Sequence, residues 1–80
     1  MFALIFTLCT SVSCQVYNIA SGTEWTTPEP CQVILEKESD FYAYMREEGF
    51  GNDLKYQARF GIRVYPSLIT DYDFTCEKVQ

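Results

Sequence analysis

Hydrophobic and polar positions divide the first part of the chain into two short extended segments. An almost uninterrupted apolar run at residues 2–8, closed by Thr10 and Ser11, is typical of a strand that is buried on both faces. After a short turn, residues 14–19 continue the extended pattern and predict a second strand. The pattern therefore predicts an N-terminal hairpin whose first strand lies at the centre of a sheet.

A long amphipathic helix is predicted next, near residues 28–48. Thr27 is a suitable N-cap, Pro28 suits the first helical position, and Gly49 is a natural end. At about 100° per residue, one set of acidic side chains falls within about 20° of a single line along the helix. These acids are Glu29, Glu36, Asp40 and Glu47. The opposite side is mainly apolar and is expected to pack on the sheet.

One acid breaks the amphipathic pattern, because Glu38 lies in the middle of the apolar side. It could be a buried acid with a raised pKa, it could form an ion pair with Arg59 or Arg63, or a kink could turn it outward. A kink or an ion pair is favoured over a catalytic acid. The residue is therefore not assigned a chemical role.

Two further segments alternate between apolar and polar residues, at residues 55–65 and 71–79. A period of two residues predicts two strands, which we expect to pair antiparallel around the turn PSLIT. In this register Arg63 lies opposite Asp73. Further along the same ladder, Arg59 lies opposite Glu77. The side chains expected on the buried face are Tyr56, Phe60, Ile62, Phe74 and Cys76.

The order strand, strand, helix, strand, strand predicts an α+β fold, with one amphipathic helix packed on a small antiparallel sheet. With 80 residues, of which 48% are hydrophobic, the chain is expected to form a single domain at residues 1–80. Trp25 falls outside the periodic segments, in the loop at residues 21–30. Packing at the edge of the core is preferred for Trp25 over exposure as an interface anchor, although the second role stays open.

The cysteines leave the redox compartment open. Cys9, Cys14, Cys31 and Cys76 include no CxxC pair, and the chain has no histidine, so a structural zinc site is disfavoured. Buried free thiols, which are common in cytosolic proteins, are the favoured interpretation. One disulfide remains an alternative, since four cysteines allow three pairings.

The apolar N-terminus has a second interpretation as an export signal. Residues 11–14 resemble a signal-peptide or lipoprotein cleavage region, which would make residues 1–13 a removable segment of a disulfide-stabilised extracytoplasmic protein. No Lys or Arg precedes Lys37, however, so the usual cationic start is missing. The run is also too short to span a bilayer, and no membrane association is expected.

Charge is segregated along the chain, whose formal net charge is −5. Residues 1–54 contain most of the acids, whereas residues 55–65 are basic. If the predicted hairpin neutralises its own arginines, the negative charge is concentrated on the helix and direct binding to nucleic acid is disfavoured. The acidic row is then either an ordinary solvated helix face or a surface for a basic partner. Self-association into a homo-oligomer is left open.

Catalytic signatures are missing from the sequence. It contains no histidine, no glycine-rich phosphate loop and no serine in a nucleophile turn. A thiol redox role would require Cys9 and Cys14 to face each other across the first hairpin. We therefore expect a protein that is not an enzyme and that needs no cofactor or metal.

The opening MFALIFTLC, together with Cys14 and Cys31, resembles the start of small uncharacterised proteins of enterobacterial phages and prophages. The resemblance covers residues 1–35 and does not reach the segments after Gly49. It implies a location in the cytoplasm of an infected bacterium, where small acidic phage proteins often disable host defences such as restriction or CRISPR systems. The combined expectation is an inhibitor that binds a basic host protein, in some cases a nucleic-acid-binding enzyme, through Glu29, Glu36, Asp40, Glu47 and Trp25.

Overall fold

The N-terminal strand forms the centre of a three-stranded antiparallel sheet in the computed structural model, which describes residues 1–20 and 23–79. Strand β1 (Phe2–Thr10) pairs on one side with β2 (Cys14–Asn18) and on the other with β3 (Ile69–Lys78). The expected α+β class, the central first strand and the N-terminal hairpin are confirmed. Ser21 and Gly22, at the start of the predicted loop, lie outside the described residues.

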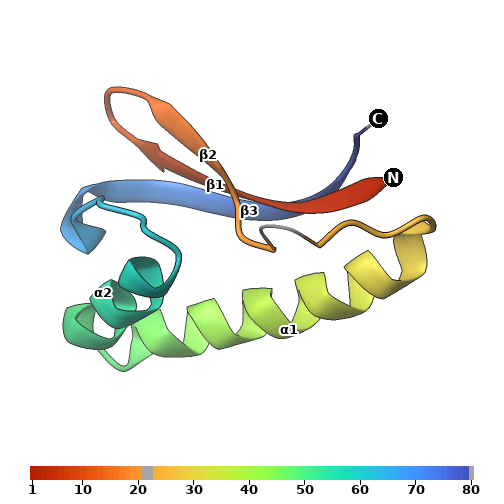
Figure 1. The fold of residues 1–80 in the computed structure, drawn as a ribbon. Helices are drawn as coiled ribbons and strands as arrows, with labels where there is room; N and C mark the ends of the chain where they lie inside the picture. The colour runs from red at the N-terminus through yellow and green to blue at the C-terminus, as the bar shows by residue number, and fades with distance from the viewer. Residues whose placement is uncertain (21–22, 80) are drawn as a thin grey trace.

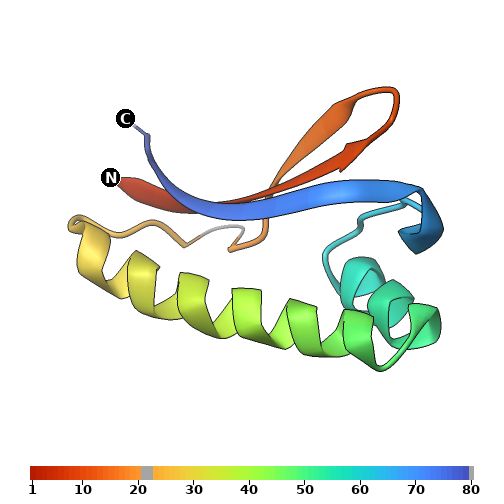
Figure 2. The same cartoon turned by 180° about the vertical axis from the view of Figure 1, so that it is seen from behind.

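Two helices lie on the same side of the sheet (Figure 1). Helix α1 (Pro28–Glu47) runs along the sheet, and α2 (Phe50–Arg59) follows after a sharp turn at Gly49, whose φ is 117°. A short 3-10 turn, η1 (Pro66–Leu68), leads into β3. The view from behind shows the same two layers, with the chain ends close together at one end of the sheet (Figure 2). One sheet face therefore packs on the helices, and none of the described elements covers the other.

The core lies between β1 and the helices because alternate residues of β1 point toward them. Leu4, Phe6 and Leu8 are buried on this face. The ring of Phe6 stacks on Phe74 with centroids 4.3 Å apart and meets Tyr42 edge-on at 4.9 Å. Aromatic pairs of this kind add to the hydrophobic stabilisation from buried area. Phe6 therefore joins the central strand, the edge strand β3 and helix α1.

The predicted C-terminal hairpin is wrong. The first half of residues 55–65 belongs to α2, and β3 pairs with β1 instead. The expected contacts of Arg63 with Asp73 and of Arg59 with Glu77 consequently do not form, since within residues 1–20 and 23–79 the ion pair found is Arg46–Asp53. The inward alternation of β3 itself, with Phe74 buried, was predicted correctly.

The end of α2 explains the error. Gly61 has a φ of 74°, and its N–H donates to the carbonyl of Ala58 while the N–H of Ile62 donates to the carbonyl of Gln57. This pair of hydrogen bonds is a Schellman motif, in which glycine closes a helix and the next residue is often apolar. Ile62 is indeed buried. The glycine within the alternating segment is thus a helix end, not a position inside a strand.

All four cysteines are paired, so the preferred interpretation of free thiols is wrong. Cys9 bonds to Cys14 because the β1–β2 register places them directly opposite each other, with Cα atoms 4.0 Å apart. Cys31 bonds to Cys76 because α1 packs on β3, which brings their Cα atoms to 6.1 Å. One disulfide closes the first hairpin and the other ties the helix layer to the sheet.

Candidate interaction surface

The four predicted acids of α1 form one exposed row, here called the acidic face of α1. Glu29, Glu36, Asp40 and Glu47 are all exposed. The helix is continuous from residue 28 to residue 47, so the row extends about 27 Å at about 1.5 Å per residue. None of these acids is in an ion pair within the described part of the chain. The sequence therefore placed these side chains on one solvent-facing surface.

Apolar and aromatic side chains border the acidic face of α1. Val33 and Tyr44 are 52% and 55% exposed. At about 100° per residue they fall within about 60° of the centre of the acidic row, on one side of it. Tyrosine is among the residues that are enriched at protein-binding surfaces, and Val33 adds exposed apolar area beside it. Sequence reasoning missed these two residues, although their helical positions were available from the same periodicity.

Trp25 lies at the edge of the core rather than projecting as a free anchor. Its backbone forms two hydrogen bonds with Phe2, at 2.7 Å and 3.0 Å. The side chain is only partly exposed and packs against the buried cluster. Trp25 is therefore a packing residue at the edge of the core, as the sequence favoured. A direct role of Trp25 in binding stays a prediction.

Glu38 has a partner that the sequence did not suggest. The hydroxyl of Tyr56 donates a hydrogen bond of 2.6 Å to the Glu38 carboxylate. Helix α1 continues through this residue, and the part of the chain that is described places no arginine in an ion pair with Glu38. Burial, followed by the hydrogen bond to Glu38, raises the pKa of Tyr56 well above its usual value. The contact fastens α2 to α1.

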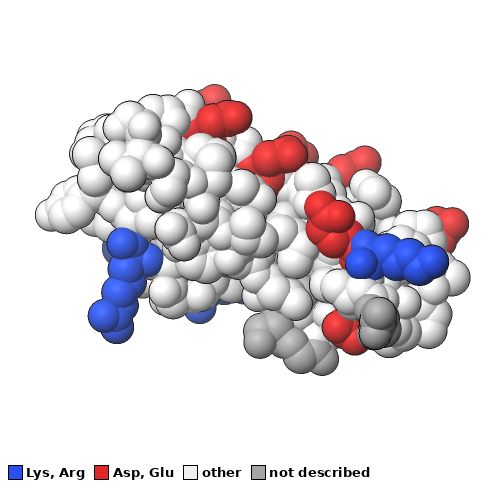
Figure 3. Space-filling view, turned by 90° about the horizontal axis from the view of Figure 1, so that it is seen from above, with Lys and Arg blue, Asp and Glu red and all other residues white. Residues whose placement is uncertain are grey.

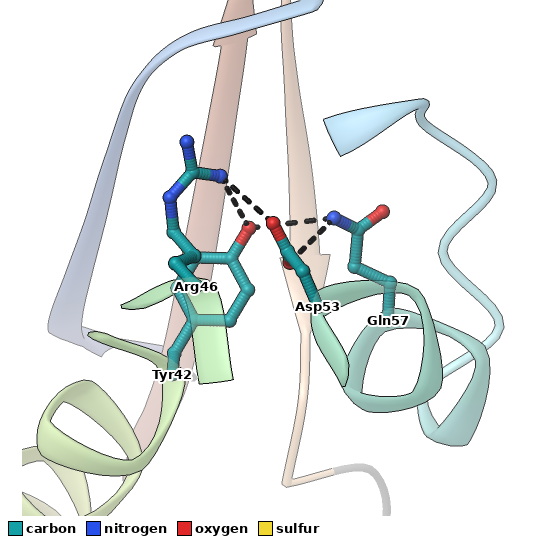
Figure 4. Close-up of polar contacts among 4 residues, drawn as sticks. All are labelled: Tyr42, Arg46, Asp53 and Gln57. Carbon is teal, nitrogen blue, oxygen red and sulfur yellow. Dashed lines mark hydrogen bonds and ion pairs between the residues drawn. The ribbon is translucent and has the colours of Figure 1, made fainter. Parts of the chain in front are cut away.

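A buried polar cluster occupies the junction of α1 and α2 (Figure 4). Asp53 and Gln57 of α2 are completely buried. Nη1 of Arg46 donates to Asp53 at 3.0 Å and to the Tyr42 hydroxyl at 3.3 Å. Nε2 of Gln57 donates to the other Asp53 oxygen at 3.0 Å and to the Tyr42 hydroxyl at 3.4 Å. We refer to these four residues as the junction cluster.

The junction cluster holds two helices together and is closed to solvent on most sides. The Arg46 guanidinium also lies 5.7 Å from the ring centroid of Tyr42 and 5.5 Å from that of Tyr72, within the range of cation–π interactions. Burial raises the pKa of Tyr42 to about 12. Oε1 of Gln57 is the one buried side-chain polar atom without a hydrogen-bond partner in the described structure. These contacts are those of a structural cluster.

Within the described residues, the basic side chains at the end of α2 lack the contacts with acids of β3 that the sequence predicted. Lys55 and Arg59 lie one helical turn apart on an exposed side of α2, and Arg63 is exposed beyond it. Since the predicted ladder does not exist, the argument that acids of β3 neutralise these arginines is wrong. The case against nucleic-acid binding now depends on the net charge of −5 and on the burial of Tyr56, whose ring is not available for stacking on a base.

The uncovered face of the sheet carries a second group of acids. Figure 3 views this face from above: Asp and Glu side chains are spread along it, and Lys and Arg side chains lie near its ends. Alternation along β3 directs Asp71, Asp73 and Glu77 to this side, where all three are exposed. Acidic side chains therefore occur on both layers of the molecule.

Residues 1–20 and 23–79 enclose no cavity, and no group of three or more His, Cys, Asp or Glu side chains among them is arranged to hold a metal ion. No helix in these residues is long and apolar enough to cross a membrane. Comparison with protein-family models, curated proteins and solved structures finds no match to this chain.

Proposed function

We propose that the protein is a binding protein that attaches to a basic surface of another protein through the acidic face of α1. The observation that carries the proposal is the exposure of all four acids along one continuous helix, beside Val33 and Tyr44. Charge complementarity would guide the encounter, and the apolar and aromatic groups would supply contact area. Binding rather than catalysis is the proposed activity.

The resemblance of residues 1–35 to phage proteins supports a more specific form of this proposal. In that form the partner is a host protein, such as a nucleic-acid-binding defence enzyme, and occupation of its basic surface inhibits it. The acidic face of α1 would then occupy the part of the host protein that otherwise binds the phosphate backbone of a nucleic acid. The identity of the partner and its inhibition are predictions.

The test is a charge reversal on α1 compared with one on the opposite layer. Glu36→Lys with Asp40→Lys should abolish capture of the partner by the immobilised protein, because both changes place repulsive charge in the proposed contact. The melting temperature should change little, since exposed substitutions usually alter stability by less than about 0.5 kcal/mol. Binding should also weaken as salt increases, mainly through slower association.

The matched control is Asp71→Lys with Asp73→Lys, which changes the net charge equally on the uncovered sheet face. This variant should keep the partner. If the α1 variant retains the partner, the acidic face of α1 is only a solvated helix surface and the proposal is wrong.

Both disulfides support a second proposal, which concerns location. Stable disulfides are typical of oxidising compartments and rare in the cytosol. The extracytoplasmic alternative therefore has more support from the structure than the expected cytoplasmic location. The structure argues against cleavage after residue 13, because residues 2–10 form the central strand of the sheet. Loss of that strand would remove Leu4, Phe6 and Leu8 from the core.

Thiol counting distinguishes the two locations. When cells that produce the chain naturally are lysed in the presence of a thiol-blocking reagent, an extracytoplasmic protein should carry no reagent on its cysteines. Its mass should also retain residues 2–10. A chain with four blocked thiols would place the protein in a reducing compartment and would contradict the second proposal.

A further inference from the structure

Strand β3 is an open edge of the sheet. The strand order β2-β1-β3 leaves one side of β3 without a neighbour among the described elements. The strand is 10 residues long, and its pairing with β1 is regular from Asp71 to Lys78. An edge of this length is an available template for one more strand.

The register identifies which backbone groups face the open side. Val79 donates its N–H to the carbonyl of Met1, so these two residues form a hydrogen-bonded pair. Such pairs alternate along an antiparallel ladder. The odd-numbered residues of β3 therefore bond to β1, and the even-numbered ones direct N–H and C=O groups outward. They are Tyr72, Phe74, Cys76 and Lys78.

The outward groups are mostly available for a partner. Only the N–H of Tyr72 is engaged, by a carboxylate oxygen of Asp71 at 2.9 Å. Within the described structure no hydrogen bond is found at this edge for the backbone of Phe74, Cys76 or Lys78. In an added antiparallel strand, the residues opposite these three would exchange backbone hydrogen bonds with them.

Side chains along β3 specify the chemistry of the added strand. Asp71, Asp73 and Glu77 lie on the uncovered sheet face, and Phe74 and Cys76 lie on the face toward the helices. Cross-strand neighbours on one face interact directly, and opposite charges there are favourable. A matching strand would place Lys or Arg opposite the acids and apolar residues on the alternate positions.

We propose that the outer edge of β3 binds an extended segment of a partner protein in which basic and apolar residues alternate. The segment adds antiparallel to the sheet, pairs its basic side chains with Asp71, Asp73 and Glu77, and continues the ladder through Phe74 and Cys76. This second surface lies on the sheet and is independent of the acidic face of α1.

Charge favours this occupant over a second copy of the chain. In a symmetrical antiparallel pair of β3 edges centred on Phe74, Asp71 of one copy lies opposite Glu77 of the other. Like charges in directly opposite positions are destabilising. The overall charge of −5 adds repulsion between two copies.

The test uses the peptide acetyl-Lys-Val-Lys-Val-Lys-Val-Lys-amide with isotopically labelled protein. Binding should slow amide hydrogen exchange at Phe74, Cys76 and Lys78, and should leave exchange in α1 unchanged. N-methylation of the valine amides should weaken binding roughly tenfold or more, because these N–H groups would face β3. N-methylation of the lysine amides is the matched control and should have little effect, since those groups face away.

Protein variants test the charge pattern. Asp73→Asn with Glu77→Gln should weaken peptide binding roughly 2- to 30-fold, as expected for two cross-strand charge pairs. Glu36→Gln with Asp40→Asn makes the same charge change on α1 and should leave peptide binding unchanged. Equal binding of both methylated peptides, or peptide protection confined to α1, would mean that charge alone attracts the peptide. A protein dimer disrupted by Lys78→Pro would identify a second copy as the occupant. Each of these results overturns the proposal.

Discussion

At the scale of single residues, two tyrosines carry their hydroxyl groups into the interior. Tyr42 and Tyr56 are buried, and their rings lie 4.9 Å apart. Burial raises the pKa of Tyr42 to about 12, and burial together with the Glu38 carboxylate raises the pKa of Tyr56 still further. An unfolded tyrosine has a pKa of about 10. Folding therefore favours the neutral form of both hydroxyl groups, and their ionisation favours unfolding.

The resulting prediction is an alkaline loss of stability. Because the folded pKa values exceed the unfolded ones, the stabilisation is complete below about pH 10 and declines as pH rises through about 12. Tyrosinate absorbance and circular dichroism, followed together, should show a phase of ionisation that coincides with unfolding. Tyr56→Phe should reduce the amplitude of this phase, whereas Tyr44→Phe removes an exposed hydroxyl and should leave it unchanged. Complete ionisation of all 6 tyrosines before unfolding would contradict the prediction.

At the scale of elements, the junction cluster determines how α2 folds back on α1. Arg46 is the cation that accompanies the completely buried Asp53, at 3.0 Å. Removing one member of a buried ion pair leaves the other charge uncompensated, at a cost of about 3–5 kcal/mol. Arg46→Ala should therefore lower the free energy of unfolding by an amount near this range, measured by urea denaturation.

Two controls separate the ion pair from a general effect of losing arginine. Arg63→Ala removes an exposed arginine and should change stability by less than about 0.5 kcal/mol. The double variant Arg46→Ala with Asp53→Ala should be less destabilised than the sum of the single variants, because it leaves no buried charge alone. Additive losses would show that the pair is not coupled.

The strands and α1 were predictable from sequence, whereas α2 was not. Strand β1 is almost entirely apolar and α1 has Pro28 at its start, so each pattern had one dominant interpretation. Residues 55–65 satisfied a period of two, but Tyr56 and Phe60 also share one side of a helix. The remaining buried positions of that side are the polar residues Asp53 and Gln57. Hydrophobic periodicity gives no signal for such a side, and Gly61 was the only local indication.

The candidate surfaces were predictable to different degrees for the same reason. The acidic face of α1 follows from helical spacing within one element, so its exposure could be anticipated. The edge of β3 could not, because it depends on which strand pairs with β1 across most of the chain. The disulfide Cys31–Cys76 depends on the same long-range packing. Contacts between distant segments were thus the missing information.

At the scale of the whole molecule, two disulfides constrain a small domain very differently. Cys31–Cys76 spans 45 residues and joins the helix layer to the edge strand β3. Cys9–Cys14 spans 5 residues within a hairpin that its own ladder already holds. A cross-link restricts the unfolded chain more when it closes a longer loop. The two bonds should therefore contribute unequally to global stability.

Replacement of each disulfide by alanine pairs measures this difference. In the chain-entropy model, loss of Cys31–Cys76 should lower the free energy of unfolding by about 4 kcal/mol, and loss of Cys9–Cys14 by about 2 kcal/mol. A domain of this size has limited stability to lose, so the Cys31→Ala, Cys76→Ala variant should be partly unfolded at physiological temperature. The Cys9→Ala, Cys14→Ala variant should remain folded and melt cooperatively. A reversed order of stability would mean that the hairpin, rather than the link between layers, limits folding. The expected order would show that the bond from Cys31, in the first turn of α1, to Cys76 of β3 contributes more to global stability than the bond that closes the hairpin.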